Sequence, residues 1–144
     1  SDGVFDNGQG ELSDAAAALD WIARQNLDYS QCWISGVSFG SLICMQLIMR
    51  RPEVNNFIAV SPQPNVYDFS FLAPCPTSGQ VIYSENDELV TKESINELDK
   101  RIKSQKGVEV IFSKIKNSNH FFKDNEKELT SEIEKYLKEK TALI

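Results

Sequence analysis

The sequence is poor in the features that mark several large classes of protein. Its longest apolar run, LICMQLIM at residues 42–49, is far shorter than the ~20 residues needed to cross a bilayer. Its three cysteines are widely separated and have no CxxC spacing, which argues against a disulfide framework and a zinc site. A net charge of -6 without any basic stripe does not favour nucleic acid or anionic lipid as a partner. We therefore expect a cytoplasmic protein that uses no metal or cofactor and binds neither nucleic acid nor membrane.

The length and composition predict one domain. With 144 residues, 41% of them hydrophobic, the chain can bury about two-thirds of the surface that its unfolded form exposes. It contains no internal repeat and no long linker. We expect residues 1–144 to form a single domain. Because the first residues lack an initiator methionine, we also expect this domain to be incomplete at its N-terminus.

Short apolar runs alternate with segments of helical periodicity along the chain. Apolar residues spaced three or four positions apart predict helices, and continuous apolar runs between turn residues predict strands. Four such alternations imply parallel strands, because parallel strands need crossover helices. The fold expected is α/β, a three-layer α/β/α sandwich with about four parallel strands. The predicted strands are 32–37, 56–60, 80–84 and 108–115, and the predicted helices are 11–25, 41–50, one capped by Thr91 and a last one capped by Asp124.

The stretch SGVSFGSL, residues 35–42, joins a predicted strand to a predicted helix. Its G-x-S-x-G pattern arises by chance in roughly one chain in twenty of this length, so the pattern alone is weak. In a nucleophile elbow, however, the serine occupies a strained strand-to-helix turn and small residues on both sides allow close packing. Ser38 has that context, with Gly36 and Gly40 beside it, and the backbone N–H of Phe39 would face a developing oxyanion. A tight turn with an exposed serine is the alternative.

A base and an acid follow two other predicted strands. Residues after parallel strands gather at one edge of the sheet, which is where ligands bind in such folds. His120 is the only histidine, so it must be the base of any acyl-transfer site, and imidazole suits that role near neutral pH. Among Glu85, Asp87 and Glu88, we favour Asp87 as the acid that orients the imidazole. Asp68 is a substitute acid, and a solvated acidic turn is the alternative.

The loop at residues 61–79 is rich in proline and aromatic residues. Its aromatic side chains would line an acyl pocket beside Ser38, but they would equally cover the open end of the sheet. No cluster of charged side chains marks a polar substrate, so we expect a small uncharged ester or thioester. The side chains expected to bind substrate are Tyr67, Phe69, Phe71 and Phe121.

The order Ser38, Asp87, His120 along the chain resembles the order of nucleophile, acid and base in the α/β-hydrolase superfamily. More narrowly, the chain is similar to small, lidless bacterial hydrolases related to dienelactone hydrolases and acyl-peptide-hydrolase-type domains. The resemblance covers nearly the whole chain and implies a serine hydrolase with Ser38 as nucleophile, Asp87 as acid and His120 as base. YSENDELVT departs from the GxxDxxVP-like stretch of that family, which puts the shape of the turn before the acid in question. The segments that carry the resemblance are FDNGQGELSDAAAALDW, GVSFGS, RRPEVNNFIAVSPQPNVYDFSFLAPCP, ENDELV and NHFF.

The same resemblance implies strands that this chain does not contain. In that superfamily several strands precede the first helix seen here, and a loop after one of them supplies a second oxyanion-hole N–H. We therefore expect weak activity from this chain alone. The strand from Cys32 to Val37 would be an unprotected edge that pairs with another chain, forming a homo-oligomer. The alternative function is a non-catalytic α/β domain that binds a partner or a small ligand.

Overall fold

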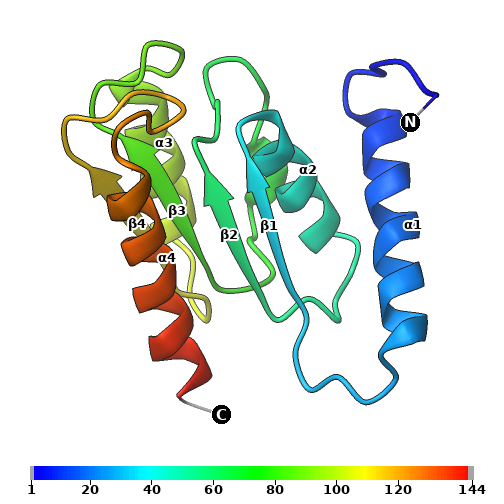
Figure 1. The fold of residues 1–144 in the computed structure, drawn as a ribbon. Coiled ribbons are helices and arrows are strands. Elements are labelled where there is room, and N and C mark those ends of the chain that lie inside the picture. Colours follow the sequence, from blue (N-terminus) through cyan, green and yellow to red (C-terminus); the bar gives the residue numbers. More distant parts are fainter. Residues whose placement is uncertain (1, 143–144) are drawn as a thin grey trace.

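The strand-forming runs assemble into one parallel sheet with helices on both faces (Figure 1). The computed structural model describes residues 2–142. The sheet order is β1-β2-β3-β4, so each strand pairs with its neighbour in sequence, and the expected α/β sandwich of four parallel strands is confirmed. The strands are β1 (Trp33–Val37), β2 (Asn56–Val60), β3 (Gly79–Ser84) and β4 (Val110–Ile115). The helices are α1 (Gln9–Gln25), α2 (Phe39–Ile48), α3 (Lys92–Lys103) and α4 (Glu126–Thr141), with a short 3-10 helix η1 (Ser70–Leu72).

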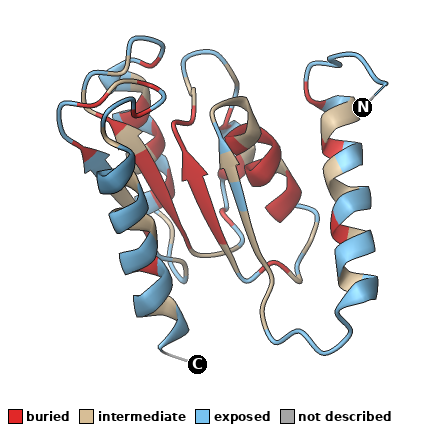
Figure 2. Ribbon diagram, viewed as in Figure 1, coloured by how far each residue is buried: buried red, intermediate tan, exposed pale blue. Residues whose placement is uncertain are grey.

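Side-chain alternation along the strands divides the core into two layers. Phe57 and Ala59 of β2 face a core to which α1, α2 and α3 contribute buried residues. Ile58 and Val60 face the opposite core, where α4 contributes Tyr136. α2 and α3 therefore cover one face of the sheet, with α1 packed against α2, and α4 covers the other face. Figure 2 shows that β2 and β3, which have a strand on each side, are the most deeply buried strands.

β1 lies at one edge of the sheet. Its only strand partner among residues 2–142 is β2, to which it pairs from Trp33 opposite Asn56 to Val37 opposite Val60. A mainly apolar groove of about 810 Å³ lies between β1, α1 and α2. The edge that sequence reasoning expected to be unprotected is therefore open in the part of the chain that the structure describes.

Two helices start earlier than the sequence pattern predicts. α1 starts two residues before the predicted 11, because Gly8 adopts a φ of +99° and donates its N–H to the Glu11 carboxylate at 2.9 Å. α2 starts directly after Ser38, whereas periodicity placed its start at 41. Both differences have the same origin, since a single residue with positive φ redirects the chain into the helix.

The N-cap of α3 was predicted correctly, and the N-cap of α4 was predicted wrongly. Thr91 caps α3 as expected, because its side-chain oxygen accepts the N–H of Ser94 at 3.3 Å. Asp124 is not the cap of α4. Asn125 occupies that position, and Asp124 lies one residue earlier with a φ of +66°. The positive φ turns the chain before the helix begins, which the pattern of apolar residues does not reveal.

None of the three cysteines is in a disulfide bond. Cys32, Cys44 and Cys75 are free thiols, and burial raises the pKa of Cys44 to about 12. Within residues 2–142, no three His, Cys, Asp or Glu side chains are grouped so that they could hold a metal ion. No helix in this range is long and apolar enough to cross a membrane.

Candidate functional site

The chain turns from β1 into α2 at a single strained residue. Ser38 has φ +55° and ψ -118°, a conformation that side-chain-bearing residues adopt only when their surroundings enforce it. Its N–H donates to the Val60 carbonyl at 2.8 Å, which continues the β1–β2 pairing into the turn. Its carbonyl accepts the hydroxyl of Ser41 at 2.5 Å. The backbone of Ser38 is thus fixed on both sides.

The strand and helix approach each other closely because Gly36 has no side chain. A Cβ at Gly36 would lie 2.0 Å from the carbonyl oxygen of Gly40, far inside van der Waals contact. A Cβ at Gly40 would meet no atom within 4 Å. The expectation that both flanking residues must be small is therefore confirmed for Gly36 and wrong for Gly40.

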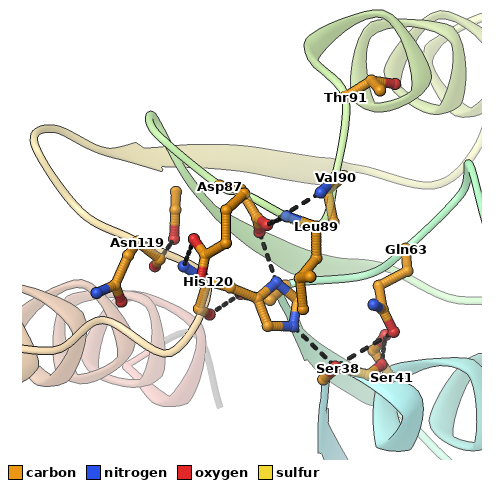
Figure 3. Close-up of polar contacts among 12 residues, drawn as sticks. Ser38, Ser41, Gln63, Asp87, Leu89, Val90, Thr91, Asn119 and His120 are labelled. Atoms are coloured by element: carbon orange, nitrogen blue, oxygen red, sulfur yellow. Dashed lines mark hydrogen bonds and ion pairs between the residues drawn. The ribbon is translucent and has the colours of Figure 1, made fainter.

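Ser38, His120 and Asp87 lie in one continuous series of hydrogen bonds (Figure 3). Ser38 Oγ is 2.8 Å from His120 Nε2, and His120 Nδ1 is 2.7 Å from Asp87 Oδ2. The His120 side chain is 0% exposed and that of Asp87 is 5% exposed. The carboxyl ends of β1, β3 and β4 bring these residues to the same edge of the sheet, as the loop positions in the sequence suggest.

The second oxygen of Asp87 anchors the acid to its own loop. Asp87 Oδ1 accepts the N–H of Leu89 at 2.8 Å and that of Val90 at 3.0 Å. These contacts leave Oδ2 free to face the imidazole. An ionised carboxylate accepts hydrogen bonds only, so Nδ1 of His120 is the donor and Nε2 of the neutral ring is the acceptor toward Ser38.

The other candidate acids bind backbone groups rather than the imidazole. Glu85 accepts the N–H of Asn117 at 2.9 Å, and Asp68 accepts the N–H of Ser70 at 2.8 Å. Glu88 accepts the backbone N–H of His120 at 3.1 Å. Among these four acids, only Asp87 makes a hydrogen bond with the imidazole ring of His120.

Buried hydroxyls hold the loop that carries His120. Ser61 Oγ donates to the His120 carbonyl at 2.8 Å, and Ser84 Oγ donates to the Asn119 carbonyl. Sequence reasoning missed both serines. Their positions in the sequence could have indicated them, because Ser61 directly follows a buried apolar strand and Ser84 ends one. A buried hydroxyl at such a position needs a hydrogen-bond partner.

Two further groups lie at Ser38 itself. The backbone N–H of Phe39, the first residue of α2, has no acceptor within its own helix, as is general for the first turn of a helix. The side chain of Gln63 places Oε1 3.2 Å from Ser38 Oγ. Gln63 was not among the residues predicted from the sequence, because a single glutamine in a proline-rich loop matches no catalytic motif.

The four predicted substrate-binding aromatics occupy different environments. Tyr67 is half-buried, and its ring centroid lies 5.7 Å from that of Phe39. Phe121 is 67% exposed, and its ring makes an edge-to-face contact with the His120 ring, with the two centroids 4.8 Å apart. Phe121 therefore contacts the His120 ring, whereas Tyr67 packs against Phe39, the residue after Ser38. Phe69 is 3% exposed and belongs to the core, so its burial disagrees with a role in lining a pocket. Phe71 is half-buried and stacks on Phe69.

Known proteins with similar sequences are longer than this chain. No protein-family profile matches it. An uncharacterized protein of Rickettsia prowazekii (strain Madrid E) is 43% identical over 141 residues, which make up 95% of this chain and 59% of that protein. A protein of unknown function from Agrobacterium tumefaciens, described as a candidate alpha/beta hydrolase, is 47% identical with a TM-score of 0.96. The match covers 99% of this chain and 65% of that one.

More distant structures extend the same similarity. An alpha-beta serine hydrolase homologue from Coxiella burnetii has a TM-score of 0.79 and 28% identity, covering 90% of this chain and 59% of that chain. A serine hydrolase without a lid from Xanthomonas campestris shares the fold, with a TM-score of 0.76 and 24% identity over 88% of this chain and 55% of that chain. This chain thus spans less than two-thirds of each of these proteins. It has the fold of the α/β-hydrolase superfamily and is similar to serine hydrolase homologues within it.

Proposed function

We propose that this chain carries the catalytic residues of a serine hydrolase that cleaves small esters or thioesters through an acyl-enzyme on Ser38. The observation that carries the proposal is the series from Asp87 through His120 to Ser38, with contacts of 2.7 and 2.8 Å. The strained backbone of Ser38 adds support, because such strain is typical of a nucleophile elbow. The similarity to the Agrobacterium and Coxiella proteins favours the same class of reaction.

The first half of the reaction forms the acyl-enzyme. Ser38 Oγ attacks the carbonyl carbon of the substrate while its proton moves to His120 Nε2. The carbonyl oxygen becomes an oxyanion, which the N–H of Phe39 and the N-terminus of α2 stabilise. Asp87 stabilises the imidazolium and keeps Nε2 directed at Ser38. The intermediate then collapses, and the alcohol or thiol leaves with the proton from His120.

The second half releases the acid. Water attacks the acyl carbon while His120 Nε2 takes one of its protons. The bond from the acyl carbon to Ser38 Oγ breaks, and Oγ recovers a proton from His120. The carboxylic acid is the product, and the site returns to its starting state.

The surroundings of Ser38 favour a small, uncharged acyl group. Phe121 packs against the His120 ring, and Tyr67 packs against Phe39, the residue that follows Ser38, so both nearby side chains are aromatic. No Lys or Arg side chain makes an ion pair or a hydrogen bond with the three central residues in the part of the chain that the structure describes. A charged acyl group would therefore lack a counter-ion beside the nucleophile.

Hydrolysis of 4-nitrophenyl acetate by the full natural chain tests the proposal. We expect turnover in the wild type and a loss of at least about 100-fold in Ser38→Ala, because the covalent step requires the hydroxyl. Ser35→Ala is the matched control, since Ser35 is an exposed serine of β1 three residues earlier, and it should retain activity. Turnover that persists in Ser38→Ala would exclude Ser38 as the nucleophile. A wild type without turnover would favour the non-catalytic alternative.

A further inference from the structure

Ser38 Oγ has two polar neighbours but only one hydrogen to donate. His120 Nε2 lies 2.8 Å away and Gln63 Oε1 lies 3.2 Å away, on the other side of the hydroxyl (Figure 3). Both atoms are acceptors when the imidazole is neutral. The hydroxyl cannot donate to both, so one of the two contacts requires a different donor.

The acid determines which neighbour receives the hydrogen. Because Asp87 occupies Nδ1 of the imidazole, Nε2 carries the lone pair and takes the hydrogen of Ser38. The group of Gln63 that faces Oγ must then be a donor. A half-turn of the carboxamide exchanges its oxygen for its NH2 at the same position. Among residues 2–142 the Nε2 of Gln63 donates to no protein group, so the half-turn breaks no other hydrogen bond within the protein.

The backbone holds Gln63 firmly beside the nucleophile. Pro62 and Pro64 flank it and restrict the chain on both sides. The carbonyl of Gln63 accepts the N–H groups of Val66 and Tyr67, each at 3.0 Å. Because the backbone is already ordered, holding the half-buried side chain beside Ser38 costs only the rotamer entropy of Gln63 itself.

We propose that Gln63 is a further catalytic residue, whose NH2 donates a hydrogen bond to Ser38 Oγ and assists hydrolysis of the acyl-enzyme. This role rests on the proposed function. When the acyl carbon–Oγ bond breaks, its electron pair passes to Oγ before or as the proton arrives from His120. The Gln63 N–H stabilises that charge and is not itself transferred. The ester oxygen of the acyl-enzyme is a weak acceptor, so the bond strengthens mainly in the transition state.

Acylation responds differently from deacylation. The same donor lowers the basicity of Oγ when the hydroxyl attacks, while it makes removal of the hydroxyl proton easier. These two effects oppose each other, so we expect only a small net change in the acylation rate. Loss of the donor should therefore separate the two halves of the reaction, which a general loosening of the site would not do.

Pre-steady-state hydrolysis of 4-nitrophenyl acetate by the full natural chain tests this role. In Gln63→Leu we expect the burst of nitrophenolate to form within about threefold of the wild-type rate, followed by steady-state turnover about tenfold slower, the effect of one lost hydrogen bond. Gln63→Glu keeps the shape but presents only acceptors to Oγ, so we expect a larger loss of deacylation. Gln31→Leu is the matched control, because Gln31 binds the Trp33 indole at the opposite end of β1.

The variants distinguish the possible failures. If Gln63→Glu deacylates at the wild-type rate, a hydrogen-bond acceptor beside Ser38 Oγ is enough for deacylation, and the proposed role of the NH2 is overturned. The role is also overturned if Gln63→Leu changes neither the acylation rate nor the deacylation rate. Equal losses of acylation and deacylation would also overturn it, since they indicate a purely structural contact. Thermal unfolding of each variant checks that the fold is intact, and the near-isosteric Gln63→Glu decides the matter if Gln63→Leu does not fold. A wild type that forms no acyl-enzyme would contradict the proposed function itself.

Discussion

His120 is held by four residues. Asp87 and Ser38 contact the two ring nitrogens, Glu88 accepts the backbone N–H, and Ser61 donates to the carbonyl. With 0% of its side chain exposed, the imidazole has little access to water that could replace a lost partner. The position and tautomer of the imidazole are thus set by specific polar contacts, and changes at single residues should affect them strongly.

Asp87→Asn should lower kcat by roughly 100- to 10,000-fold with little change in the fold. The asparagine can still accept the N–H groups of Leu89 and Val90, but it then presents an NH2 to Nδ1, which favours the wrong tautomer of His120. Asp68→Asn is the control, because Asp68 is exposed and only caps Ser70. Steady-state kinetics with 4-nitrophenyl acetate measure the effect. Equal activities of the two variants would exclude Asp87 as the orienting acid.

Glu88 should link the stability of this loop to pH. Hydrogen bonds from its own backbone N–H and from that of His120 hold the pKa of the Glu88 carboxyl below its ordinary value. A lowered pKa means that the ionised carboxylate stabilises the fold above the unfolded-state pKa, and that this contribution is lost as pH falls through the folded-state pKa. Glu88→Gln should therefore be less stable than the wild type at pH 7, and the difference should shrink below a pH of about 4.

Urea unfolding at several pH values measures this difference. Glu139→Gln, which changes an exposed glutamate of α4, serves as the control and should show a smaller difference at pH 7. A difference between wild type and Glu88→Gln that stays constant from pH 7 to pH 3.5 would contradict the assignment. Such a result would mean that the Glu88 charge does not contribute through its contact with His120.

At the scale of elements, the approach of β1 to α2 creates the turn at Ser38. Gly36→Ala should destabilise the protein by about 1–3 kcal/mol or more, because the added Cβ would overlap the Gly40 carbonyl at 2.0 Å. Gly40→Ala is the matched control in the same motif. It lies in α2 with no atom near its Cβ position, so it should be neutral or slightly stabilising. Urea unfolding compares the two, and equal destabilisation would contradict the role of Gly36 in close packing.

The sequence was sufficient to predict the elements that rely on continuous apolar patterns. β2 was predicted at its observed bounds, and β1 and β3 within one residue, because buried parallel strands are short apolar runs between turns. The helix starts were less predictable. Gly8, Ser38 and Asp124 have positive φ values, and positive φ at these positions results from contacts distant in sequence or from local turns that periodicity does not encode.

The grouping of the candidate residues was predictable where residue type limits the choice. One histidine and a serine between two glycines identified His120 and Ser38, and the strand order placed Asp87 near them. Gln63 could not be identified, because its role depends on a backbone fixed by two prolines and by hydrogen bonds to its carbonyl. Phe69 shows the opposite error, a residue that was predicted to bind substrate because it lies in an aromatic loop, although its side chain is buried in the core.

At the scale of the whole molecule, α2 packs against one face of β1, and the outer edge of β1 pairs with no strand among residues 2–142. The groove beside β1 is mainly apolar and includes Ile22 of α1, which is exposed. Unpaired strand edges of this kind readily pair with other strands. We propose that a second copy of the chain pairs with the free edge of β1.

Light scattering of the protein at several concentrations tests this association, and we expect a dimer. Ile22→Lys should weaken it, because the charge would be placed in the apolar groove. Trp21→Lys is the control, since Trp21 is exposed on α1 and does not line the groove. A clean monomer at all concentrations would contradict the pairing.

Covalent labelling of Ser38 tests the central claim most directly. The wild-type protein is treated with diisopropyl fluorophosphate, and its peptides are mapped by mass spectrometry. We predict a single adduct, located on Ser38, which is lost when the protein is unfolded in urea and is formed much more slowly in Asp87→Asn. Absence of an adduct on Ser38 under conditions that label a control esterase, or adducts spread over exposed serines such as Ser35, would contradict Ser38 as an activated nucleophile.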